Sequence, residues 1–211
     1  MTIRKFTFNS FQENTFLLSD DSKECIIFDP GCSNPKEEQE LKAYIEELEL
    51  KPVRLINTHC HIDHVLGNKF VSETWDLPLE AHAGEVPVLE SGIQVSQMYG
   101  IAYNPSPPIA KYIEVGDEIH FGNSILQTYF TPGHSPASLS FYHEESKNLI
   151  AGDVLFYGSI GRTDLPGGNF DTLIKSIKEQ LFPLGDEVIV HPGHGPSTSI
   201  GFEKENNQFL Q

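Results

Sequence analysis

Apolar positions along the chain predict two similar successions of strands and helices. Short runs that alternate or are fully apolar indicate strands. In the first half these runs are "RKFTFN", "NTFLLS", "ECIIFD", "VRLINT" and "LPLEAH". Apolar residues spaced three or four positions apart predict a helix that begins at Pro35, with Ser33 or Asn34 as its cap. A second helical pattern covers residues 65–75.

The middle of the chain is less regular. Residues 84–100 predict a helix, and residues 101–110, "IAYNPSPPIA", predict a proline-rich loop. From residue 112 onward strands return as "EIHFG", "SILQTYFT", "SLSFYHE", "KNLIAG" and, near the end, "EVIVHPGHG". An apolar stripe from Phe170 to Leu181 predicts a further helix before the last strand, and a short helix is expected from about residue 199.

The order of these elements is strands, helix, strand, helix, and then the same plan again. Such an order predicts an α/β protein built as an αββα sandwich, in which two mixed β-sheets are flanked by helices. The chain has 211 residues and no low-complexity run that would mark a linker. We therefore expect a single domain over residues 1–211.

The charge of the chain narrows the choice of partners. Fourteen Lys and Arg face 30 Asp and Glu, a formal net charge of −16. This balance argues against nucleic acid and against anionic membranes. No apolar run is long enough to span a membrane, and the N-terminus has no apolar block of the signal-peptide kind. We expect a cytoplasmic protein, and an anionic substrate would need a local positive charge to hold it.

Candidate chemistry gathers in "THCHIDH", residues 58–64. His59 and His61 are two positions apart at the end of a predicted strand, so both imidazoles can face one ion. Asp63 and His64 follow where the chain turns into a helix and can face the same place from another side. Imidazole and carboxylate are the usual ligands of zinc and iron. We therefore expect a metal here, while Cys60 is expected to point away from it.

Three further donors occupy equivalent places in the second half. His134 follows a strand and a Pro-Gly turn in "YFTPGHSP", Asp153 follows a strand and a glycine in "LIAGDVLF", and His194 follows a strand and a Pro-Gly turn in "IVHPGHGP". In each case an apolar strand delivers one donor into a loop that contains glycine, which tolerates crowded backbone. The repetition predicts a site with more than one metal ion.

With these motifs the sequence resembles the metallo-β-lactamase superfamily. "GSIGRTDLPGGN" and "HPGHGPSTSIGFEKENN" also look like the short, single-domain glyoxalase II-like hydrolases. The resemblance implies two divalent metal ions, zinc or alternatively iron or manganese. It implies that His59, His61 and His134 hold the first ion, that Asp63, His64 and His194 hold the second, and that Asp153 bridges both.

The same resemblance implies the reaction. A metal-bound hydroxide would cleave a small anionic acyl thioester such as S-lactoylglutathione, with Asp63 and Asp153 as the catalytic carboxylates and Asp63 orienting the hydroxide. A thiolate has a pKa of about 8.5, so it leaves without a strong general acid. Asp29, at the end of a buried-looking strand, could accept a hydrogen bond from a ligand histidine. Arg162 could bind a substrate carboxylate or could tie its loop to Asp164.

Other reactions share much of this donor string. A persulfide dioxygenase of the same fold would use one iron, held by His59, His134 and Asp153. A lactone hydrolase is a second alternative. A non-enzymatic interaction protein is disfavoured, because an inert scaffold has no need of all seven donors. The short length of the chain and "LPGG" after "GRTD" favour the hydrolases.

Overall fold

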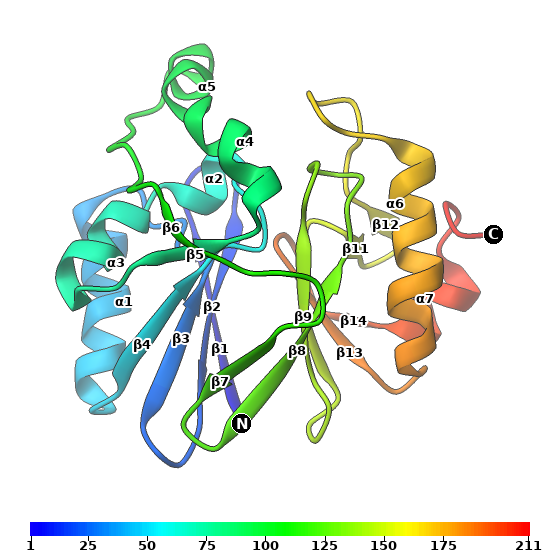
Figure 1. Cartoon of the computed structure of the whole chain (residues 1–211), viewed down its shortest axis with the longest axis horizontal. Coiled ribbons are helices and arrows are strands. Elements are labelled where there is room, and N and C mark those ends of the chain that lie inside the picture. Colours follow the sequence, from blue (N-terminus) through cyan, green and yellow to red (C-terminus); the bar gives the residue numbers. More distant parts are fainter. The chain divides into compact units, whose positions relative to one another are not determined.

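A mixed six-stranded sheet is the centre of the first of two compact units in the computed structural model, which describes residues 1–211. This unit comprises residues 1–113 and 120–124. Its strands are β1 (Thr2–Phe8), β2 (Glu13–Ser19), β3 (Glu24–Phe28), β4 (Lys51–Ile56), β5 (Leu79–Ala81) and β6 (Ile109–Tyr112), and they are neighbours in that order (Figure 1). The pairs β1–β2 and β2–β3 are antiparallel, and the pairs from β3 to β6 are parallel.

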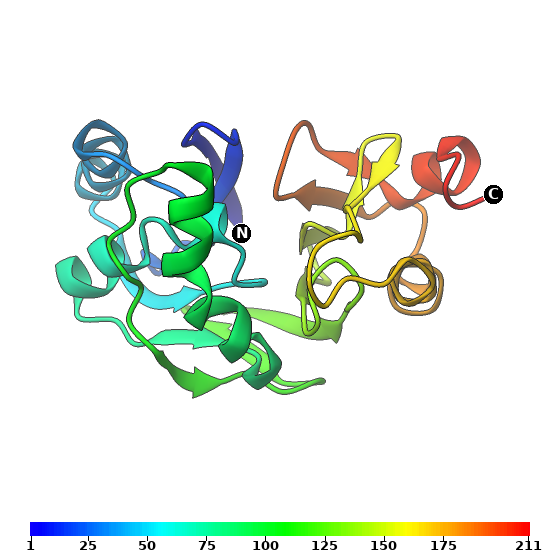
Figure 2. The same ribbon diagram turned by 90° about the horizontal axis from the view of Figure 1, so that it is seen from above.

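Helices of the first unit cover its sheet. They are α1 (Pro35–Glu47), α2 (Ile62–Val65), α3 (Asn68–Trp75), the 3-10 turn η1 (Ala83–Glu85), α4 (Val86–Glu90) and α5 (Gly92–Tyr99) (Figure 2). Asn34 caps α1 through its side chain. Leu41 and Ile45 of α1 and Val71 of α3 are buried with Ile27 and Leu55 of the sheet in one apolar cluster.

A second mixed sheet is the centre of the other unit, residues 114–119 and 125–211. Its strands are neighbours in the order β14 (Thr198–Ser199), β13 (Ile189–Pro192), β10 (Asn148–Gly152), β9 (Leu139–His143), β8 (Ser124–Phe130) and β7 (Glu118–Phe121). The strands β10 and β13 are parallel. A separate hairpin is formed by β11 (Leu155–Phe156) and β12 (Ser159–Ile160).

The second sheet has its own apolar core. The helices of this unit are α6 (Phe170–Ser176), the π-helical turn η2 (Ile177–Leu181), the 3-10 turn η3 (Phe182–Leu184) and α7 (Ile200–Asn206). Leu173 and Ile177 pack in one buried cluster with Leu149 of β10, Val190 of β13 and Ile200 of α7. Each sheet is therefore stabilised by burial of apolar surface against its own helices.

Several element boundaries differ from the sequence-based predictions. The predicted helix over 84–100 is broken at Ser91 into α4 and α5, and the helical pattern over 65–75 is interrupted before α3. The predicted loop over 101–110 ends early, because Ile109 begins β6, an edge strand that pairs with β5. The hairpin β11–β12 was not predicted, since strands of two residues leave no alternation to detect. No helix in the structure has the length and apolar character needed to cross a membrane.

Candidate metal centre

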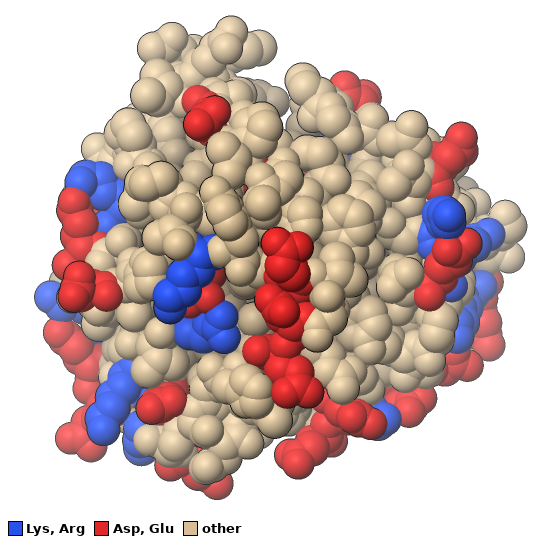
Figure 3. Space-filling view, viewed as in Figure 1, with Lys and Arg blue, Asp and Glu red and all other residues tan.

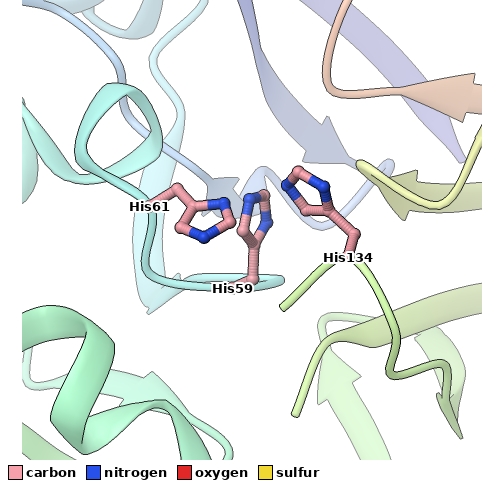
Figure 4. Close-up of side chains that lie close together, drawn as sticks. All are labelled: His59, His61 and His134. Carbon is pink, nitrogen blue, oxygen red and sulfur yellow. The ribbon is translucent and has the colours of Figure 1, made fainter. Parts of the chain in front are cut away.

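The end of β4 delivers the first group of donors. The chain bends at Thr58 and His59 after β4, and His61, which precedes α2, has extended backbone with φ −64° and ψ 153°. The rings of His59 and His61 lie side by side, with centroids 4.8 Å apart and planes at 88° (Figure 4). The first turn of α2 adds His64, whose ring centroid is 4.1 Å from that of His59. Asp63, in the same turn, places Oδ2 3.8 Å from Nε2 of His64.

Asp29 orients two of these histidines from behind. Its Oδ1 accepts a hydrogen bond from Thr58 N at 2.7 Å, and its Oδ2 accepts one from Thr58 Oγ1 at 2.6 Å. Because Thr58 donates its only hydroxyl proton to Asp29, it accepts from Nδ1 of His59, 3.1 Å away. Oδ2 of Asp29 is also 3.2 Å from Nδ1 of His64. His59 thus carries its proton on Nδ1 and keeps a lone pair on Nε2, as a metal ligand requires, and the carboxylate beside Nδ1 of His64 favours the same tautomer there.

A second buried acid stands behind His64 and was missed by sequence reasoning. Glu13 is fully buried at the start of β2, with Oε1 3.9 Å from Nδ1 of His64. Its Oε2 accepts a hydrogen bond from Thr15 Oγ1 at 2.9 Å. Burial raises the pKa of Glu13 well above its usual range, which favours the protonated form. A lone glutamate at a strand end carries no pattern that could have indicated this role.

The second unit places its donors in the same way, each after a strand. His134 follows β8, Asp153 follows β10 and His194 follows β13. Oδ2 of Asp153 lies 3.5 Å from Nε2 of His134 and 3.4 Å from Nε2 of His194. One carboxylate oxygen therefore stands between two imidazole nitrogens. His134, which is also drawn in Figure 4, is buried together with Asp153.

The loop after the β11–β12 hairpin orients His134. Nδ1 of His134 lies 2.7 Å from the carbonyl oxygen of Arg162. A carbonyl only accepts, so Nδ1 donates its proton there and the lone pair is left on Nε2. Gly161, the residue before Arg162, lies close to the backbone of Asp153. A Cβ atom at position 161 would meet the carbonyl oxygen of Asp153 at 2.0 Å, so only glycine fits there.

The Arg162 side chain forms an ion pair within its own loop. Nε donates to Oδ1 of Asp164 and Nη2 donates to Oδ2, both at 2.7 Å. The hydrogen bonds from Arg162 hold the pKa of Asp164 at about 2. The two side chains are 56% and 67% exposed. The bond to Asp164, one of the two roles expected for Arg162, is thus formed in this structure.

Another buried acid supports the loops around His194. Glu203 accepts hydrogen bonds from Gly158 N at 3.0 and 3.1 Å, from Thr198 Oγ1 at 2.5 Å and from Asn207 Nδ2 at 2.7 Å. It thereby ties α7 to the β11–β12 hairpin. Phe156 of that hairpin packs edge-on against His194, with ring centroids 6.3 Å apart. Sequence reasoning did not single out Glu203.

The cysteine within the histidine motif has a structural place. Cys60 is buried in an apolar cluster with Ile62 and Val65. Its backbone N–H donates to Oε2 of Glu85 at 2.9 Å. Burial raises the pKa of the Cys60 thiol well above its usual range, so the thiolate that would bind a metal is disfavoured.

The donors fit divalent metal ions in their chemistry. His59, His64 and His134 are buried, the groups beside Nδ1 favour a lone pair on Nε2 in each of them, and two carboxylates accompany them. A buried set of imidazoles and carboxylates is costly without a cation to bind. The histidine and aspartate clusters are consistent with a binuclear metal site.

Comparisons with known proteins agree with this chemistry. A family model described as "Metallo-beta-lactamase superfamily" matches residues 9–194. The "Probable metallo-hydrolase YqgX" of Bacillus subtilis is 41% identical over 100% of this chain and 98% of its own length. The "Hydroxyacylglutathione hydrolase GloC" of Haemophilus influenzae is 36% identical over 100% of this chain and 98% of its own length.

A solved structure is similar over nearly the whole length. "TTHA1623 in a di-iron-bound form" has a TM-score of 0.89 and 35% identity, and the match covers 98% of this chain and 100% of that one. The predicted fold class is therefore confirmed, and the family match together with the donor clusters supports a metal-dependent hydrolase. The chain belongs to the metallo-β-lactamase superfamily and has its fold.

Proposed function

We propose that this protein hydrolyses acyl thioesters at a pair of divalent metal ions. His59, His61 and His134 would hold the first ion, and Asp63, His64 and His194 the second, with Asp153 between them. The observation that carries this proposal is the position of Asp153 Oδ2, which is almost equally far from Nε2 of His134 and Nε2 of His194. That is the arrangement expected of a carboxylate shared by two neighbouring ions. The di-iron form of the TTHA1623 structure supports the number of ions.

The bound ions would supply a water activated at neutral pH and a Lewis acid for the thioester carbonyl. The residues of the chain do the rest. Asp63 accepts a proton from the attacking water and orients it. Asp29 and Thr58 keep the protons of His59 and His64 on Nδ1, so that Nε2 faces the site. The leaving thiolate has a pKa of about 8.5 and needs no protein acid.

The charge of the site suits a substrate with anionic character near the scissile bond. Two divalent ions carry four positive charges, and Asp63 and Asp153 remove two of them. The centre stays positive inside a protein whose formal net charge is −16. It would therefore attract the oxygen on which negative charge develops as the carbonyl is attacked.

The reference substrate is S-lactoylglutathione, which is suggested by the name of the Haemophilus influenzae relative. The test is a panel of thioester, lactone and persulfide substrates, run on protein whose metal content has been measured. We expect cleavage of the thioester, loss of activity on chelation, and recovery when zinc, iron or manganese is added back. Thioester cleavage that persists in metal-free protein would overturn the proposal.

A second candidate shares only the metal of that similar structure, which is iron, and differs from it in using one ion instead of two. A persulfide dioxygenase would use one iron held by His59, His134 and Asp153. It would consume oxygen with glutathione persulfide and would leave the thioester intact. The persulfide assay of the panel, in which oxygen uptake is followed with an electrode, distinguishes the two reactions.

A further inference from the structure

We propose that a cavity in the first unit binds the thiol arm of the substrate and that it accepts an uncharged arm in preference to one with carboxylates. The inference rests on the proposed thioester hydrolysis and names the class of thioester. It predicts that thioesters of neutral, amide-bearing thiols are cleaved more efficiently than S-lactoylglutathione, whose thiol arm carries two carboxylates.

The cavity has a volume of about 320 Å³, a size at which small-ligand sites begin. Its lining comes from the β1–β2 turn, the start of α1, the residue after α2 and the segment after α5. The lining residues are Asn9, Ser10, Ser33, Asn34, Glu37, Leu66, Ile101 and Ala102. The volume is larger than a short acyl group such as lactoyl requires, so we assign the cavity to the longer thiol arm.

Asn9 joins the cavity wall to the backbone of Asp63, one of the proposed metal-binding residues. Its Nδ2 donates to the carbonyl oxygen of Asp63 at 3.0 Å and to that of Gly31 at 2.9 Å. Leu66, on another wall, is two residues after His64. A substrate whose carbonyl reaches Asp63 could therefore extend an arm into this cavity.

The charges around the cavity disfavour an anion. None of the lining residues is Lys or Arg, and Glu37 contributes a carboxylate. The N-terminus of α1 also offers few free N–H donors to an anion, because side chains already accept hydrogen bonds from them. Asn34 Oδ1 accepts from Lys36 N at 3.1 Å and from Glu37 N at 3.2 Å. Glu37 Oε2 accepts from Ser33 N at 2.7 Å. A carboxylate in the cavity would meet a like charge with no cation to offset it.

The remaining wall is apolar and comes from a segment poor in charge. Residues 86–110 contain one charged residue, Glu90. Figure 3, in the view of Figure 1, shows mostly uncharged atoms over α4 and α5. Tyr99 at the end of α5 packs edge-on against Phe11 of the β1–β2 turn, with centroids 5.4 Å apart. Hydroxyl and amide groups on one wall and apolar groups on the other suit a neutral arm with an amide.

The direct test is a matched pair of lactoyl thioesters, one of N-acetylcysteamine and one of N-acetylcysteine. The two thiols differ by a single carboxylate. Values of kcat/KM are measured on protein of known metal content, with lactoylglutathione as a third substrate, and each is divided by the rate of hydroxide-catalysed hydrolysis to remove differences in leaving group. We expect the N-acetylcysteamine ester to be favoured by about threefold or more, the scale of one unfavourable contact between partly exposed charges.

Two matched lysine variants, one inside the cavity and one outside it, test whether the charge of the cavity sets the preference. Ser10 is exposed, so Ser10→Lys should fold and bring a cation to the lining. Gln39→Lys makes the same change in net charge at an exposed position of α1 outside the lining. Ser10→Lys should raise kcat/KM for the two carboxylate-bearing esters by about threefold relative to kcat/KM for the neutral ester. Gln39→Lys should leave the ratio between the esters as in the wild type.

Three results would overturn the inference. The first is equal or better cleavage of the carboxylate-bearing esters by the wild type. The second is an equal effect of Ser10→Lys and Gln39→Lys, since this would trace the preference to net charge and not to the cavity. The third is no cleavage of any thioester by metal-loaded protein, which overturns the proposed function as well. The first two leave thioester hydrolysis standing, so the two failures can be told apart.

Discussion

Oδ2 of Asp153 lies 3.5 Å from Nε2 of His134, and the far side of that imidazole is fixed by the carbonyl of Arg162. The carboxylate and the imidazole therefore present one acceptor each toward the same point. We expect Asp153→Ala and His134→Ala to lose metal and to lower kcat/KM by more than about a hundredfold. Circular dichroism should show a retained fold.

A histidine outside the cluster serves as the control. His120 is exposed on β7, and His120→Ala should keep both the metal content and the activity. Wild-type turnover in His134→Ala or Asp153→Ala would count against the site as described.

His194 separates the two candidate reactions. Thioester hydrolysis at two ions needs His194, whereas a site of one iron held by His59, His134 and Asp153 does not. We expect His194→Ala to reduce bound metal from two ions per chain to one and to abolish most thioester cleavage. Oxygen uptake with persulfide that survives His194→Ala would favour the dioxygenase.

Asp29 acts through the histidines that it orients. Asp29→Asn replaces one acceptor oxygen by a donor, which conflicts with the protons that Thr58 Oγ1 and His64 Nδ1 direct at it. We expect metal affinity to fall by about 10- to 100-fold, measured by competition with a chromogenic chelator. Asp21→Asn, at an exposed position, is the matched control. Unchanged affinity in Asp29→Asn would show that the histidine tautomers do not depend on Asp29.

The turn after β2 gives a prediction about acid stability. Partial burial acts to raise the pKa of Asp20, but hydrogen bonds from Ser22, Asn123 and Ser124 outweigh it and lower the pKa from 3.8 to about 2. A carboxyl group with a lowered pKa stabilises the folded state above its unfolded pKa and loses that contribution as the pH falls through its folded pKa. The stability lost in Asp20→Asn should therefore be largest above pH 4 and should shrink between pH 4 and pH 2.

Urea unfolding at several pH values measures this difference. Asp21→Asn is again the control, since the neighbouring carboxylate is exposed. If Asp20→Asn lowered the free energy of unfolding by the same amount from pH 6 to pH 2, this would contradict the lowered pKa.

The donors of the candidate site could be proposed from the sequence because their spacing is local. His59 and His61 are two positions apart shortly after an apolar strand, and His134, Asp153 and His194 each come within four residues of the end of an apolar strand. Because hydrophobic patterns predict where a strand ends, they also indicate which histidines and aspartates lie just after a strand and could bind a metal. The fold class could be predicted for the same reason, from the repeated order of strands and helices.

The supporting residues could not be predicted, because their roles depend on contacts distant in sequence. Glu13 is buried beside His64, and Glu203 holds Gly158, which is 45 residues away. The strand β6 lies in a proline-rich stretch and is recognisable only through its pairing with β5. These features arise from tertiary packing, which overrides local preference.

Titration of metal-free protein with zinc or iron, with bound metal and thioester cleavage measured on the same samples, shows whether two ions are needed for the reaction. We expect activity to saturate at two ions per chain, and we expect His194→Ala to saturate at one ion with little activity. Full thioester cleavage at one ion per chain, or in protein without metal, would contradict this expectation.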